Sequence, residues 1–182
     1  MPLNLDALGA YRESSGIDGS AGQDRLVLVV DDEPDVRSLA AFTMRAGGFR
    51  VALAGDGDEL EAVARAERPH VILSDLLHPG SHNGLTGIGA LRADPDLAHT
   101  RWVVYSAVTG LAELHREALE AGADLVLGKL IGPEELLASV VRIADTPLDV
   151  LIERRNRNAE DPDSAEVATS SAEGRREPGT AL

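Results

Sequence analysis

The sequence predicts an α/β protein in which one five-stranded parallel sheet carries helices on both of its faces. Short, continuous aliphatic runs alternate with helical patterns along the central part of the chain. A strand of a parallel sheet is buried on both faces, so it needs a continuous apolar run rather than an alternating one. Regular alternation of such runs with helices is typical of doubly wound sheets, and right-handed crossovers leave few topologies.

Prolines and glycines set the limits of the expected elements. Pro34 and Pro133 suit the first turn of a helix, whereas Gly47, Pro69 and Gly122 each end or follow one. In chain order, strands are expected at 26–30, 49–54, 71–75, 102–106 and 125–128, and helices at 34–46, 58–67, 85–92, 111–120 and 133–144.

Composition divides the chain into three parts. Residues 1–24 are rich in glycine and serine and are expected to form a flexible tail, and residues 25–146 form the domain. Residues 147–182 are polar, with a short helix expected at 148–157 and disorder beyond it.

The apolar residues of this short helix allow three interpretations. Leu148, Val150, Leu151 and Ile152 could extend the preceding helix, pack back on the domain or await a partner, and packing is favoured. The stretch 154–157 is expected to be a solvated helix end.

Charge and composition exclude several classes of protein. The chain has 31 acidic and 17 basic residues, a net charge of −14 and no long basic run, which disfavours direct nucleic-acid binding. It lacks cysteine, so disulfides, zinc–thiolate sites and cysteine nucleophiles are excluded. No apolar run approaches the roughly 20 residues of a membrane span, and no secretory signal is evident at the start. We therefore expect a cytoplasmic protein without membrane contact.

The residues that follow the predicted strands carry the chemistry. Asp31 and Asp32 follow the first strand, Asp75 ends the third, Ser106 ends the fourth, and Lys129, the only lysine of the chain, follows the fifth. In doubly wound sheets the ligand site lies beyond these carboxyl ends. Clustered carboxylates favour a hard cation such as Mg²⁺, and a lysine and a hydroxyl beside it suit phosphoryl transfer to a carboxylate. Asp31 to Glu33 could instead be acidic residues that merely favour a helix N-terminus.

Four segments, in order and suitably spaced, resemble the receiver domains of bacterial two-component response regulators. They are VLVVDDE at 27–33, VILSD at 71–75, VVYSA at 103–107 and GADLVLGK at 122–129. The resemblance covers about 120 residues, from Arg25 to Asp145. It implies a flavodoxin-like sheet with the strand order 2-1-3-4-5.

The resemblance also implies a role for each site residue. Asp75 matches the phosphate-accepting aspartate, Ser106 the switch hydroxyl and Lys129 the lysine that pairs with phosphoryl oxygens. The metal ligands of Mg²⁺ would be Asp32 directly, Asp31 through a water, Asp75, and the backbone carbonyl of Leu77.

Two positions depart from the family pattern. Leu130 follows the lysine where the family usually has proline, often after a cis peptide bond. A cis bond before another residue costs about 2.5–4 kcal/mol, so we expect a trans bond here. Val126 stands where the family often has an aromatic switch residue.

The function implied is that of a single-domain response regulator. A sensor histidine kinase or a histidine phosphotransfer protein would supply the phosphoryl group, and output would be a protein–protein contact, with no DNA-binding effector domain. The chain would not be an enzyme beyond its own phosphotransfer and slow autodephosphorylation. Hydrolysis of the aspartyl phosphate is expected to be slow. In receiver domains the side chains at the positions of Leu77 and Val108 flank the path of the attacking water, and these two apolar side chains cannot orient a water molecule.

Two further functions are compatible with the sequence. One is that of a pseudo-receiver, an interaction module that keeps the fold and works without phosphorylation, which Leu130 and Val126 favour. The second is that of a metal-dependent phosphohydrolase with an aspartyl nucleophile. Such enzymes usually have an acidic residue two positions after the nucleophile; Leu77 after Asp75 fits this pattern poorly, and Glu33 after Asp31 leaves the alternative open.

Overall fold

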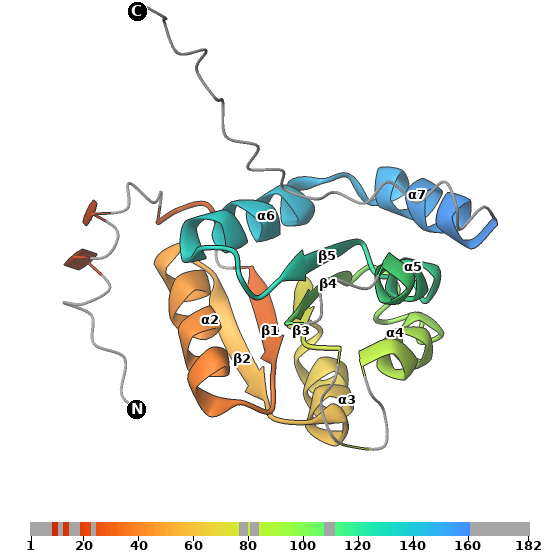
Figure 1. Ribbon diagram of the computed structural model, residues 1–182, viewed down its shortest axis with the longest axis horizontal. Coiled ribbons are helices and arrows are strands. Elements are labelled where there is room, and N and C mark those ends of the chain that lie inside the picture. Colours follow the sequence, from red (N-terminus) through yellow and green to blue (C-terminus); the bar gives the residue numbers. More distant parts are fainter. Residues whose placement is uncertain are drawn as a thin grey trace, which may run out of the picture.

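The computed structural model describes residues 9–10, 13–14, 19–22, 25–76, 80, 84–107 and 112–160. Five strands form one fully parallel sheet in the order β2-β1-β3-β4-β5, which confirms the predicted fold class and topology (Figure 1). The strands are β1 (Leu26–Val30), β2 (Arg50–Ala54), β3 (Val71–Ser74), β4 (Arg101–Ser106) and β5 (Leu125–Gly128).

Six helices complete the part of the fold that these residues define, and they cover both faces of the sheet (Figure 1). They are α2 (Pro34–Ala46), α3 (Gly57–Glu67), α4 (Gly84–Arg92), α5 (Ala112–Glu120), α6 (Pro133–Asp145) and α7 (Leu148–Glu160). Residues of α2 and α6 share one hydrophobic core with the sheet, and residues of α3, α4 and α5 share the second core on the opposite face. Within the described residues, no helix has the length and apolar character needed to cross a membrane.

The central strand β1 explains why its sequence is uniformly aliphatic. Val27 and Val29 enter the core on the α2 and α6 face, whereas Leu28 and Val30 enter the core on the opposite face. All five residues of β1 are buried. A continuous apolar run is therefore required, because successive side chains point to opposite, equally buried faces.

Part of the segment predicted to be a flexible tail is docked on the domain. Gly22 is buried, and its NH donates to the carbonyl of Gly47 at 2.6 Å. A Cβ atom on Gly22 would lie 2.4 Å from the backbone nitrogen of Phe49, so only glycine allows this approach. Residues 19–22 thus cover the turn between α2 and β2.

Helix α7 is separate from α6 and lies beside α5 (Figure 1). Its inward positions recur at helical spacing: Leu151 and Asn158 are buried, and Leu148 and Arg155 are half-buried. Leu151 belongs to the same core as β5 and α6, which confirms that this segment packs back on the domain, whereas Val150 and Ile152 on the same helix are exposed.

The expectation of a solvated helix end at 154–157 is wrong for Arg155. Its Nε and Nη2 donate to the two carboxylate oxygens of Asp124 at 2.7 and 2.8 Å. Asp124 is buried just before β5 and also accepts from Arg92 at 2.9 Å and from the NH of Trp102 at 2.8 Å. The arginine-rich stretch 154–157 gave no sign of this ion pair, because Asp124, the partner of Arg155, lies on another part of the chain.

We expect Arg155→Ala to loosen α7 without unfolding the domain. Asp124 keeps Arg92 and the Trp102 NH, so no buried charge is left unpaired, and the free energy of unfolding should fall by about 1–3 kcal/mol. Hydrogen exchange should show faster exchange of the α7 amides. Arg154→Ala, at an exposed neighbouring position, is the matched control; equal protection of α7 in both variants would contradict the role of the ion pair.

Candidate functional site

The carboxyl ends of four strands bring the predicted site residues to one edge of the sheet. Asp31 follows β1, Asp75 follows β3, Ser106 is the last residue of β4, and Lys129 follows β5. Since the strands are parallel and neighbouring, these residues meet at the same edge. The main chain closes the gap further, because the NH of Asp75 donates to Val30 at 3.0 Å and that of Lys129 to Ser106 at 2.9 Å.

Asp31 is buried, and partners hold both its carboxylate and its main chain. One carboxylate oxygen accepts from the NH of Glu33 at 3.0 Å, and the second lies 2.7 Å from Lys129 Nζ. The NH of Asp31 donates to the carbonyl of Ala54 at 3.3 Å, and its own carbonyl accepts from the guanidinium of Arg37. The orientation of Asp31 is therefore fixed before any ligand arrives.

Asp75 is the second buried carboxylate of the site. One of its oxygens lies 2.8 Å from Lys129 Nζ, and the second accepts from the NH of Leu76 at 2.6 Å. Ser106, itself buried, also hydrogen-bonds to this carboxylate. Lys129 thus bridges Asp31 and Asp75, and its side chain is only 10% exposed.

The electrostatics of this pair favour its charged form. Burial raises the pKa of Asp75, but hydrogen bonds from Lys129 and Ser106 lower it by more, so its pKa lies below the usual value. Burial lowers the pKa of Lys129, but hydrogen bonds to Asp31 and Asp75 raise it by more. At neutral pH the site therefore holds an ionised carboxylate and an ammonium group.

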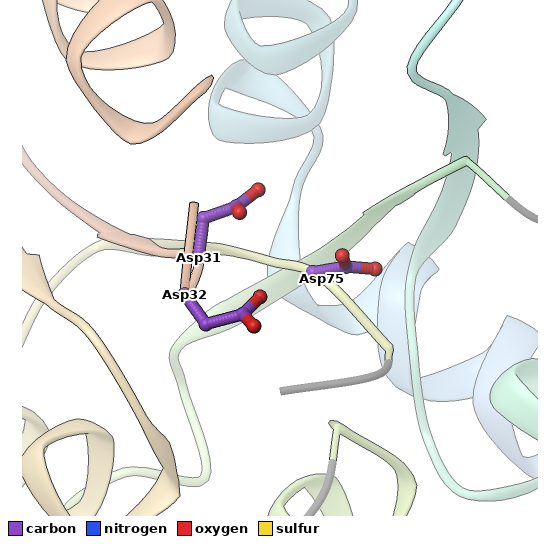
Figure 2. Close-up of side chains that lie close together, drawn as sticks. All are labelled: Asp31, Asp32 and Asp75. Atoms are coloured by element: carbon purple, nitrogen blue, oxygen red, sulfur yellow. The ribbon is translucent and has the colours of Figure 1, made fainter. Parts of the chain in front are cut away.

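Asp31, Asp32 and Asp75 have the chemistry of a divalent-cation site. One carboxylate oxygen from each lies within 4.8 Å of those of its two neighbours, and Asp31 and Asp32 leave the same turn (Figure 2). Asp32 is exposed whereas Asp31 and Asp75 are buried, so the cluster is accessible from one side. Carboxylate oxygens with an open side suit Mg²⁺, which retains waters and adds phosphate oxygens. The residues present therefore fit this cation.

Two residues with predicted roles lie outside the described residues. They are Leu77, whose carbonyl is expected to bind the cation, and Val108, which is expected to flank the path of water. Ala107, between Ser106 and Val108, is exposed.

The loop after the lysine keeps a trans peptide bond before Leu130, as expected from its sequence. Leu130 itself is 92% exposed, and Val126 is buried in the core that β5 shares with α5.

Sequence reasoning missed two contributors to the site. The NH of Leu76 is a backbone donor, which no side-chain pattern reveals. Arg37 lies within an expected helix and was given no role, although a cation one and a half turns after an acidic turn is a signal that sequence reasoning can follow.

Comparisons with known proteins agree with this geometry. Residues 27–141 match the family model described as the response regulator receiver domain. The DNA-binding response regulator MtrA of Mycobacterium leprae is 32% identical over 148 residues, which cover 74% of this chain and 64% of that protein. The match thus spans less than two thirds of the length of that relative.

Solved structures are similar in the same region. The chemotaxis response regulator CheY4 of Vibrio cholerae is 31% identical with a TM-score of 0.61, covering 65% of this chain and 98% of that one. The receiver domain of the response regulator NarL from Mycobacterium tuberculosis is 28% identical with a TM-score of 0.62, covering 68% and 98%. With its sheet order, its family match and these relatives, the chain belongs to the response regulator receiver-domain family.

Proposed function

We propose that Asp75 accepts a phosphoryl group from a phosphohistidine of a sensor histidine kinase or a histidine phosphotransfer protein. The observation that carries this proposal is the placement of the Asp75 carboxylate, which is held between Lys129 Nζ at 2.8 Å and the NH of Leu76 at 2.6 Å. Two further carboxylates, Asp31 and Asp32, lie within 4.8 Å of it.

The transfer balances as a displacement at phosphorus. A carboxylate oxygen of Asp75 forms the new P–O bond, the P–N bond to the donor imidazole breaks, and its electron pair leaves with that ring. The ammonium of Lys129 then offsets the negative charge on the phosphoryl oxygens, and the hydroxyl of Ser106 donates to one of them. Asp31, Asp32 and Asp75 would hold Mg²⁺, which supplies further charge neutralisation when bound.

The wider role follows as part of the same proposal. The chain acts as a phosphorylated signalling protein of the cytoplasm, where its phosphoryl donors act, and passes its state on through contacts with proteins. It catalyses its own phosphotransfer and slow autodephosphorylation, and no reaction on a separate substrate.

Beryllofluoride, which imitates an attached phosphoryl group, tests this proposal. Added with Mg²⁺ to the full chain, it should shift the backbone amide signals of Glu33, Leu76, Ser106 and Lys129 in nuclear magnetic resonance spectra. Fluoride with Mg²⁺ but without beryllium is the control. Unchanged signals with beryllofluoride would contradict phosphorylation and favour a pseudo-receiver that works without it.

A further inference from the structure

Arg37 makes a contact at the site that the proposed chemistry does not use. It lies on α2, and its guanidinium donates to the main-chain carbonyl of Asp31, six residues earlier. Its own main-chain NH donates to the carbonyl of Glu33 at 2.9 Å. The main-chain bond is the ordinary first bond of the helix, so the contact specific to Arg37 is that of its guanidinium, which ties α2 to the residue that begins the Asp31–Asp32 turn.

Apart from the hydrogen bond that the NH of Glu33 donates to the Asp31 carboxylate, the start of α2 gives this turn little further support. Glu33 is the N-cap of α2, but its side chain makes no capping hydrogen bond, and Pro34 at the first helical position has no NH to donate. Asp32 is exposed, so packing does not restrain it. The contact from Arg37 therefore replaces the restraint that a capping side chain would provide.

Arg37 also reaches the neighbouring loop between β2 and α3. Its Nη1 lies 3.5 Å from the position that a Cβ on Gly55 would occupy, and the NH of Gly55 donates to Glu59 at 2.7 Å. The NH of Asp31 in turn donates to Ala54, which ends β2. Arg37 is half-buried, and its guanidinium thus lies between two loops.

We propose that Arg37 is a positioning residue, which holds the Asp31–Asp32 turn in the conformation that binds a divalent cation. This inference rests on the proposed function, because it assumes that Asp31, Asp32 and Asp75 form the cation site. Groups that orient metal ligands from behind typically change metal affinity by about 10–100-fold when they are removed.

Whether removal of the Arg37 guanidinium strengthens or weakens Mg²⁺ binding tells a positioning role from an effect of charge. A cation near three carboxylates repels Mg²⁺, so if charge alone mattered, removal of the Arg37 guanidinium would strengthen binding. If Arg37 acts by positioning, its removal weakens binding, because the turn samples conformations in which the carboxylates do not converge. The two explanations therefore predict opposite changes.

The experiment measures Mg²⁺ affinity of the full chain by titration calorimetry. Arg37→Met keeps an apolar stem but removes donor and charge, and we expect about tenfold weaker binding. Arg37→Lys keeps a donor and the charge and should restore most of the affinity. Arg157→Met removes the same charge at an exposed position on α7, away from the carboxylate site, and should leave the Mg²⁺ affinity unchanged. Wild-type or tighter binding by Arg37→Met, or no rescue by Arg37→Lys, would overturn the proposal.

Two further measurements complete the test. The amide signal of Glu33, which donates to Asp31, should shift in Arg37→Met at an unchanged melting temperature; an unmoved signal would contradict the positioning role. Asp32→Asn should bind Mg²⁺ weakly. If Asp32→Asn binds Mg²⁺ like the unchanged protein, the carboxylate site itself is wrong and both proposals fail. If Asp32→Asn binds weakly but Arg37→Met binds like the unchanged protein, only the role of Arg37 is refuted.

Discussion

Asp75→Asn is expected to reduce labelling by a small phosphodonor such as acetyl phosphate to background. The substitution keeps the size of the side chain but replaces the nucleophilic carboxylate by an amide, whose lone pair is delocalised. Phosphate-affinity electrophoresis of the full chain with Mg²⁺ measures the labelled fraction.

The fold should survive this change. Lys129 loses the charge of Asp75 but keeps the carboxylate of Asp31 at 2.7 Å, so its ammonium is not left unpaired. Asp149→Asn, the same chemical change at an exposed position on α7, should label fully. Wild-type labelling of Asp75→Asn would mean that a different residue accepts the phosphoryl group.

The fold was predictable because its signals are local. The aliphatic run of β1 and the Pro34 that opens α2 depend on neighbours in sequence, and both lie where they were expected. The ends of the five predicted domain helices shift by at most one residue, and α7 extends to Glu160 instead of ending at 157. The contact between Gly22 and Gly47 was missed, because both partners contribute only backbone atoms and no side-chain pattern marks them.

In the site, too, some contacts could be predicted from local sequence and others could not. Asp31, Asp75 and Lys129 could be brought together from sequence, since each directly follows a strand and parallel strands end at one edge. The partner of Arg155 could not be assigned, because which carboxylate or carbonyl a long side chain reaches depends on the packing of several elements. Arg155 and Asp124 lie 31 residues apart, and only the position of α7 joins them.

Lys129→Arg is expected to slow phosphorylation about 100-fold, although it keeps the positive charge. The ammonium of Lys129 touches Asp31 and Asp75 at 2.7 and 2.8 Å in a site where its side chain is only 10% exposed. A planar, wider guanidinium cannot occupy that point without displacing one carboxylate, and loss of one well-placed donor typically costs a factor of about 10²–10³. The initial rate of labelling by acetyl phosphate measures the effect, and a wild-type rate in Lys129→Arg would contradict a special role for the lysine.

Lys129→Met provides the matched comparison, because it keeps a flexible stem of similar length without charge. Lys129 neutralises the same two carboxylates that Mg²⁺ would bind, so the ammonium and the metal compete for them. Removal of the ammonium should therefore strengthen Mg²⁺ binding in titration calorimetry while phosphorylation falls. Opposite changes in the two measurements cannot arise from a collapsed site, which would weaken both. If Lys129→Met binds Mg²⁺ more weakly than the unchanged protein, Lys129 supports the carboxylates rather than competing for them.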